Sequence, residues 1–377
     1  MLWLLVAVIF LYFAKCDAVQ SNFHNRLHRL AMPHPVIDAA ERVRRDILNR
    51  EAATTRRLTD AYGRAYQRMQ TQIAALEEQL ATAGELSRAK AANLATLRSL
   101  RNQVIDEVGR FAVFAEQEIS LGAATAIERG LEDALALSQA YFTTQPSLDA
   151  LSAAWRVLPA DQVETMIGFL GPDSPLHTSF VSQLGESVAA RMEDALLDGI
   201  ALGRGPRQIA AIVRRELGQG LTWSLNTVRT AQVWSYREAT RASFIANSDI
   251  VDGWTWYAQL DNRVCMSCVA KHGSKHPVDE VLNDHHSGRC VALPNLPLAK
   301  SLGIKQPEIQ PGEVWFTGLP QAQQRGLMGP AKFAAWRDGA FAFNQLSQPY
   351  DDPVYGDMLR EASLIGILGD AARQYYI

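Results

Sequence analysis

Residues 36–145 contain no proline, and this run is the feature that most constrains how the chain folds. The run is rich in Ala, Leu, Arg, Glu and Gln, which are good helix formers. Proline inside a helix removes a backbone hydrogen bond and clashes with the preceding turn, so its absence permits helices of many turns. We therefore predict that residues 36–145 form a helical arm or a helical hairpin.

Two apolar repeats in this region predict that its helices pack on one another. In each repeat the apolar residues keep a helical spacing, which places them on one face. The first repeat comprises Met69, Ile73, Leu76, Leu80 and Ala83, and the second comprises Leu94, Leu97, Val104, Val108 and Phe111, with Arg101 interrupting it. Gly84 lies between the repeats and could reverse the chain. Runs this short favour packing within one chain over a long coiled-coil dimer.

The charge of the chain is small overall but uneven. A net charge of −3 over 377 residues argues against a protein whose whole surface is built for nucleic acid. Residues 41–68, however, contain eight arginines and four acids. This segment is either a solvated helix surface or a contact for DNA or an acidic protein. The candidate contact residues are Arg42, Arg44, Arg45, Arg56 and Arg57.

The first fourteen residues, MLWLLVAVIFLYFA, form an uninterrupted apolar run. As a helix they would span about 21 Å, which is shorter than a hydrocarbon core of about 30 Å. No basic residue precedes the run and no clear small-x-small cleavage site follows it, which weakens a signal-peptide interpretation. Residues 1–20 are therefore a membrane-contacting anchor, a buried helix or a start-site artefact, and these alternatives stay open.

Residues 146–247 are predicted to form a second helical domain. Prolines and glycines between 146 and 175 mark a loop. Pro206 suits the first turn of a helix that Gly218 would end, and another helix would run from Thr222 to about Ala246.

After residue 247 the spacing of apolar residues changes to a period of two. The stretch GWTWYAQLD, which includes Trp254 and Trp256, predicts a β-strand. The fold class we expect is mainly α, with a long helical N-terminal region followed by a small α+β module over residues 248–300. A C-terminal motif region (301–350) and a tail (351–377) complete the chain.

Three of the four cysteines lie close together after this predicted strand. Such clustering favours a reducing compartment and a metal site over a disulfide framework. Cys265 and Cys268 form a Cys-x-x-Cys turn, and His285 with Cys290 is the best second pair for a tetrahedral zinc ion. Three thiolates and one imidazole leave no open position on the ion. We therefore predict a structural, zinc-knuckle-like site.

Other interpretations of this cluster stay open. His286 could replace His285, or the cysteines could be a reduced thiol pair beside exposed histidines. An enzymatic alternative is an HNH-type metal-dependent nuclease, in which Asp284, His285 and His286 would hold a divalent ion and activate water. That fold needs a closing helix with a further His or Asn, whereas residues 291–313 contain four prolines and no histidine.

Several blocks between about 195 and 347 resemble the head morphogenesis domain of phage Mu F-like minor head proteins. The blocks are the segment GRGPRQIAAIVRREL, the Arg229-Thr230 pair, the strand WTWYAQLDNRVCMSC with Asp261 and Arg263 before the cysteines, the Lys271-His272-Gly273 turn, and the stretch from Trp315 to Leu346. Two positions depart from the family pattern. Gly288 replaces the first cysteine of a Cys-Arg-Cys motif, and Ala231 stands where relatives commonly have Glu.

The resemblance implies a minor capsid protein of a phage or prophage, present in few copies and not an enzyme. Its location would be the procapsid or virion interior, and the host cytoplasm during assembly. Its partners would be the portal protein and a scaffold or major capsid protein, with phage DNA as a further candidate. Some relatives carry C-terminal toxin or enzyme domains, and the roughly 30 residues after the last motif are too few for one.

Overall fold

The computed structural model describes residues 34–82, 88–167, 186–202, 206–286 and 288–376, together with residues 174, 176 and 204. Residues 1–20 and Gly84 lie outside the described residues, so the hypotheses about them stay predictions.

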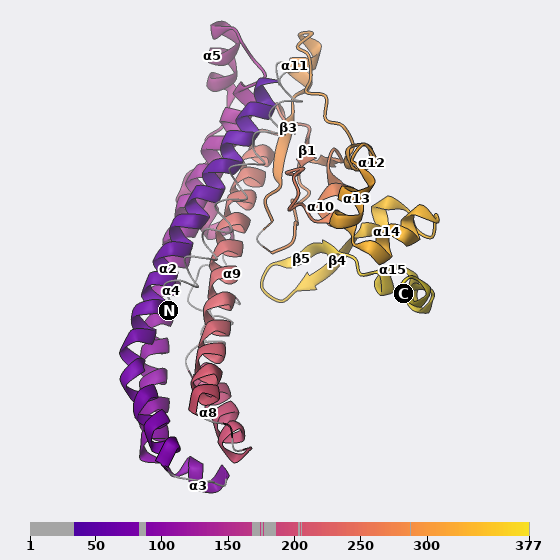
Figure 1. The fold of residues 1–377 in the computed structure, drawn as a ribbon. Coiled ribbons are helices and arrows are strands. Elements are labelled where there is room, and N and C mark those ends of the chain that lie inside the picture. Colours follow the sequence, from indigo (N-terminus) through magenta and orange to yellow (C-terminus); the bar gives the residue numbers. More distant parts are fainter. Residues whose placement is uncertain are drawn as a thin grey trace.

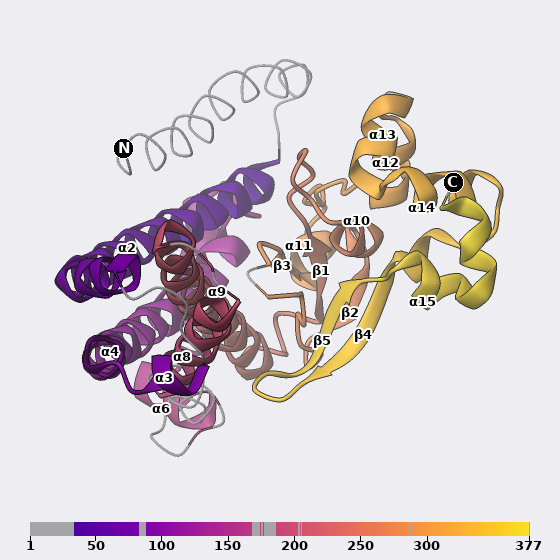
Figure 2. The same cartoon turned by 60° about the horizontal axis from the view of Figure 1, so that its bottom comes forward.

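Three long helices, α2 (Pro35–Thr82), α4 (Ala95–Gln139) and α9 (Pro206–Ala246), form the body of the molecule. They run side by side in Figures 1 and 2. Helix α5 (Gln145–Ala154) lies at one end of this bundle, and α3 (Arg88–Ala92) and α8 (Glu186–Ala201) lie at the other. Helix α6 (Ala160–Ile167) contacts α4 and α9.

Two ion pairs show that α2 and α4 are antiparallel. Arg57 pairs with Glu118 and Arg68 pairs with Glu107, each with a shortest distance of 2.6 Å, so the residue numbers run in opposite directions. Most of the residues of both apolar repeats are buried between these helices and their neighbours. Arg101, which interrupts the second repeat, pairs with Glu193 of α8 at 2.7 Å. Helices α2 and α4 thus pack antiparallel, and the expected long helical N-terminal region is confirmed.

Helix α9 corrects one prediction, because Gly218 does not end a helix. A single helix continues through Gly218 from Pro206 to Ala246. The Tyr62 hydroxyl of α2 donates to the carbonyl oxygen of Leu217, and Tyr62 also packs edge-on against Phe111 of α4. A glycine inside a helix costs only about 1 kcal/mol, and packing against two long neighbours outweighs that cost.

We expect Gly218→Ala to raise the free energy of unfolding by about 0.5–1 kcal/mol. Gly218 is exposed, and a Cβ added there would meet nothing within 4 Å. The change therefore removes backbone entropy from the unfolded chain without a clash. Urea denaturation would measure it. Lower stability in the variant would instead indicate that the helix ends at this residue in solution.

The α+β module follows α9 and contains a three-stranded antiparallel sheet. Strand β1 (Gly253–Tyr257) lies between β2 (Lys275–Pro277) and β3 (Val291–Asn295). Helix α10 (Met266–Lys271) connects β1 to β2. Gly273 adopts a φ of 83° between α10 and β2, and its backbone N–H donates to the Trp256 carbonyl oxygen at 2.8 Å. The strand predicted from the two tryptophans is confirmed.

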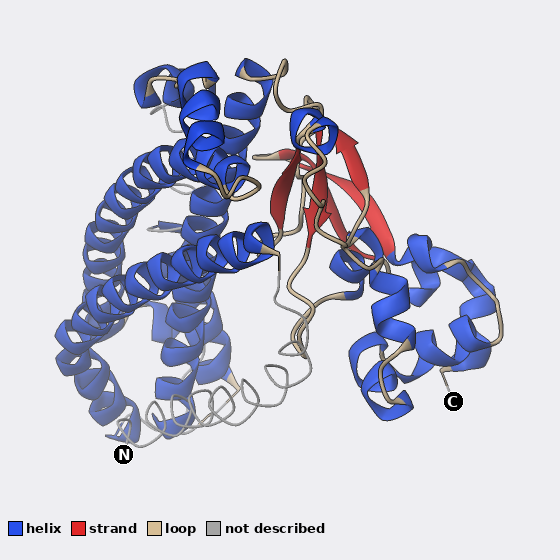
Figure 3. Ribbon diagram, turned by 90° about the horizontal axis from the view of Figure 1, so that it is seen from above, coloured by secondary structure: helices blue, strands red, loops and turns tan. Residues whose placement is uncertain are grey.

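Short helices and a hairpin follow the sheet. They are α11 (Pro297–Ser301), α12 (Gly312–Thr317), α13 (Gln321–Met328), α14 (Pro330–Arg337), β4 (Ser347–Asp352), β5 (Gly356–Glu361) and α15 (Leu364–Leu368), with 3₁₀ turns at Phe343–Leu346 and Gly369–Tyr375. Figure 3 shows the strands between the helical bundle and the C-terminal helices. The tip of the β4–β5 hairpin reaches back to α9, where Tyr355 packs near Trp234.

The sheet shares one apolar core with the upper part of the bundle in Figure 1. Val43 of α2, Leu137 of α4 and Phe244 of α9 belong to the same buried cluster as Trp254 and Trp256. The cysteine-rich segment therefore packs on a surface that the bundle supplies. A second cluster fills the other end of the bundle.

Among the residues that the structure describes, none of the helices combines the length and apolar character needed to cross a membrane. The apolar run at residues 1–14 is not among them.

Candidate metal centre

Cys265 and Cys268 lie at the start of helix α10. Cys265 is the residue before the first turn, and its Sγ accepts a hydrogen bond from the backbone N–H of Cys268 at 3.3 Å. This capping arrangement brings both sulfurs to the same end of a short helix, which is why Cys-x-x-Cys turns suit metal ions.

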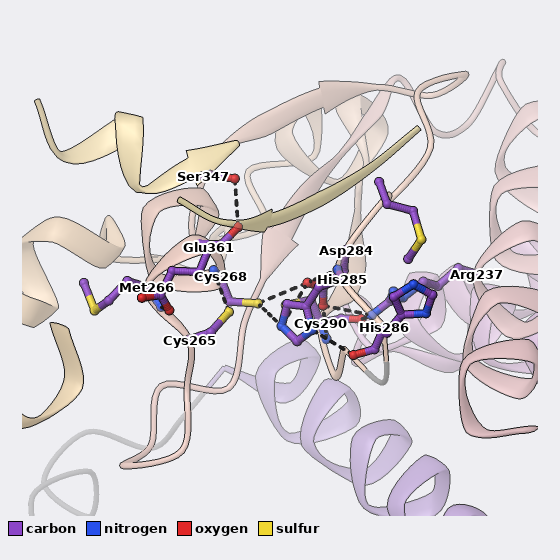
Figure 4. A network of polar contacts seen from close by, with 12 residues as sticks. Arg237, Cys265, Met266, Cys268, Asp284, His285, His286, Cys290, Ser347 and Glu361 are labelled. Carbon is purple, nitrogen blue, oxygen red and sulfur yellow. Dashed lines mark hydrogen bonds and ion pairs between the residues drawn. The ribbon is translucent and has the colours of Figure 1, made fainter. Parts of the chain in front are cut away.

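The other candidate ligands come from the segment that joins β2 to β3. Asp284 and His285 lie in this segment, and Cys290 directly precedes β3. Two overlapping groups have donor atoms within 4.8 Å of one another: Cys265, Cys268 and His285 form one, and Cys268, Asp284 and Cys290 form the other. The structure thus brings all four predicted ligands together around Cys268 (Figure 4).

Cys268 lies at the centre of this cluster. Its Sγ is 3.4 Å from His285 Nε2 and 3.1 Å from Asp284 Oδ1, and the last two atoms are 3.5 Å apart. Distances of this size let side chains converge on one ion after small movements, since a tetrahedral zinc ion binds sulfur at about 2.3 Å and nitrogen at about 2.0–2.1 Å. The donors present therefore fit a soft divalent metal ion.

Asp284, which the sequence suggested only as a residue of a nuclease site, is a member of the cluster. Its side chain is 1% exposed, and Oδ2 is 3.1 Å from Arg237 Nη2 of helix α9. Because Asp284 directly precedes His285 in the sequence, it could have been predicted as a member of the cluster. Arg237 has no comparable signal, because it lies 47 residues earlier in the chain.

The absence of a side chain at Gly288 leaves room for the Asp284 carboxylate. A Cβ added at this glycine would lie 2.1 Å from Asp284 Oδ2 and 2.8 Å from the carbonyl oxygen of His285. No side chain fits there unless the carboxylate moves. The position that carries a cysteine in the family pattern is thus filled by the Asp284 side chain.

Charges within the cluster shift the pKa values of several of its groups. Burial opposes ionisation of Asp284, but the charges of His285 and Arg237 outweigh it and lower the pKa of this carboxyl to about 2. Burial likewise opposes protonation of His285, but Asp284 and Cys265 raise its pKa to about 9. Hydrogen bonding from Cys268, together with His285, lowers the pKa of Cys265 to about 5. Without a metal ion, the cluster therefore holds a thiolate beside an imidazolium.

The pKa values of the other two thiols, Cys268 and Cys290, are raised instead of lowered. Hydrogen bonds with Cys265 and Cys290, together with burial, raise the pKa of Cys268. Burial also raises the pKa of Cys290. A bound divalent cation would reverse this, because metal ligands bind as thiolates and release their protons.

The residues of the nuclease hypothesis do not all face the same point. His286 turns away from the cysteines, and its Nε2 is 2.9 Å from Asp352 Oδ2 of strand β4. His285, in contrast, lies with Cys265 and Cys268, which favours it over His286 as the metal ligand.

The five arginines proposed for partner contact divide into two sets. Arg44 is buried and pairs with Glu41, and Arg57 pairs with Glu118 of α4. Arg42, Arg45 and Arg56 are exposed on helix α2. Arg57 is exposed as well, although its guanidinium is engaged by Glu118, whereas no ion pair is described for the second set.

Comparison of the chain with family models, with curated proteins and with solved structures gave no match.

Proposed function

We propose that the chain is a minor head protein of a phage or prophage that acts structurally in procapsid assembly and in DNA packaging or ejection. The observation that carries this proposal is the ordered series of motif blocks between about 195 and 347. These blocks fall on α9, on β1 with the start of α10, and on α12 to α14, and residues from all of these elements share buried clusters with their neighbours. If the motif blocks belong to one domain, the elements that carry them are expected to share a core.

The metal in this proposal is zinc, held by Cys265, Cys268, His285 and Cys290. Thiolate and imidazole donors favour zinc over magnesium or calcium, which prefer oxygen ligands. Zinc would supply a fixed tetrahedral link between the start of α10 and the segment before β3, with no open position for a substrate. Two of these ligands, Cys268 and Cys290, are buried, and the other two are partly buried, which supports a structural role because a catalytic ion needs an accessible face.

The shape of the molecule supports a role in assembly. The bundle of α2, α4 and α9 extends well beyond the compact module in Figure 1 and presents a long helical surface. Portal, scaffold or major capsid protein would bind this bundle, and Arg42, Arg45 and Arg56 are available for acidic groups or for DNA phosphates.

Quantitative mass spectrometry of purified procapsids and virions from an induced host tests the proposal. We expect a few copies of this chain per particle when the portal protein serves as the internal standard. Absence from both particles, with the chain recovered in host membranes, would contradict it and turn attention to residues 1–14.

The nuclease alternative predicts a different result with purified protein. Cleavage of DNA in the presence of a divalent ion, lost in a folded His285→Ala variant, would favour it over a structural site.

A further inference from the structure

A buried ion pair joins helix α9 to the candidate metal centre. The side chain of Arg237 is 7% exposed and that of Asp284 is 1% exposed. Removing two charges from water costs several kcal/mol per ion unless good geometry and further hydrogen bonds offset the cost. A pair in this position therefore needs a physical reason.

The contacts of Arg237 reach both ends of the segment that carries the ligands. Its Nη2 donates to Asp284 Oδ2 at 3.1 Å and to the carbonyl oxygen of Cys290 at 3.2 Å. Among the residues that the structure describes, its Nε is buried without a hydrogen-bond partner. The hydrogen bonds that the structure describes for this guanidinium thus both go to the ligand segment.

Asp284 carries this connection to the ligands themselves. Its Oδ1 accepts a hydrogen bond from the backbone N–H of His285 at 2.8 Å and faces Cys268 Sγ at 3.1 Å. One carboxylate therefore contacts Arg237 with one oxygen and two candidate ligands with the other (Figure 4).

We propose that Arg237 is a positioning residue of the metal centre, and that metal binding thereby fixes helix α9 against the ligand segment. This inference rests on the proposed zinc site. A zinc ion with three thiolates and one neutral imidazole carries a net charge of −1, and the Asp284 carboxylate adds a second negative charge in a buried place. Arg237 compensates one of these two negative charges and orients Cys290 through its carbonyl oxygen. Outer groups of this kind commonly change metal affinity by about 10- to 100-fold.

The helix itself provides a matched control residue. Arg241 lies about one turn further along α9 and also reaches the module, where its Nη1 is 3.5 Å from the carbonyl oxygen of Asp279. Its ion pair is with Glu238 of the same helix, and none of its described contacts is with the Cys/His cluster. Arg241→Met therefore removes an arginine from the same helix and the same interface while leaving the metal centre untouched.

The experiment measures zinc affinity by chelator competition, and hydrogen exchange along α9 with and without zinc, in the full chain. In the unchanged protein we expect zinc to slow exchange around residues 233–240. Arg237→Met should weaken zinc binding by about 10- to 100-fold and remove that protection, while residues 265–290 are still protected at saturating zinc. Arg241→Met should match the unchanged protein.

Arg237→Lys keeps the test decisive if the methionine variant does not fold. Lysine retains the buried charge but, as a single compact donor group, cannot reproduce the planar fork of arginine. We expect an affinity between those of the unchanged protein and the methionine variant. The proposal would be overturned if both Arg237 variants bound zinc as tightly as the unchanged protein. It would also be overturned if zinc protected α9 from exchange equally in the variants and in the unchanged protein. Failure of the unchanged protein to bind zinc would overturn the metal site as well, without bearing on particle association.

Discussion

Cys268→Ser is expected to abolish stoichiometric zinc binding and to lower the free energy of unfolding by about 4 kcal/mol when free zinc is a thousandfold above its dissociation constant. The reason is the central place of Cys268, which belongs to both groups of candidate ligands. A serine hydroxyl is a poor substitute for a thiolate on a soft metal ion. Metal analysis of the purified protein and thermal unfolding with and without chelator would measure the two effects.

Ser267→Ala is the matched control for this substitution. Ser267 is also buried in the first turn of α10, but its hydroxyl contacts Ser347 at 2.8 Å instead of the cluster. Its loss should cost about 1 kcal/mol and leave the zinc content unchanged. If chelator has no effect on the stability of the unchanged protein, the site does not hold a structural ion and the prediction fails.

Gly130→Val is expected to lower the free energy of unfolding by about 3 kcal/mol or more, because it forces apart two of the long helices. Gly130 is buried where α4 meets α9. A Cβ there would lie 2.5 Å from the carbonyl oxygen of Tyr236 and 2.9 Å from the Cβ of Ala239. Neither atom can move away without a shift of the α9 backbone. Urea denaturation would give the change in stability.

Gly109→Val on the same helix separates this clash from the effect of valine on helix formation. A Cβ at Gly109 would meet nothing within 4 Å. We expect that variant to be as stable as the unchanged protein or slightly more stable, since valine forms helix better than glycine. Equal stability of the two variants would show that α4 and α9 do not approach closely at Gly130.

Local sequence was sufficient for the helical hairpin and the strand. The repeats containing Met69 and Val104 predicted faces that the structure buries, because the period of apolar residues in a helix is a local property. Gly218 shows the limit of such reasoning. Its low helix propensity predicted an end, but packing of α9 against α2, α4 and α8 decides the outcome.

The candidate metal centre was predictable only in its ligand types. The spacing of Cys265, Cys268, His285 and Cys290 indicated a tetrahedral set, and in the structure these residues belong to two overlapping groups that share Cys268. The place of Asp284 in this cluster depends on the open space at Gly288, which no spacing rule describes. Three-dimensional packing therefore decides which acid joins the cysteines.

By itself, the sequence determined the mainly helical class, the position of the strand at Trp254 and the cysteine and histidine side chains of a possible metal site. These properties follow from local propensity, periodicity and side-chain chemistry, which act over a few residues. Only the tertiary structure decided that α9 is continuous, that the bundle and the sheet share a core, and that Arg237 meets Asp284. Each of these depends on contacts between residues far apart in the chain, where packing and burial of charge outweigh local preference.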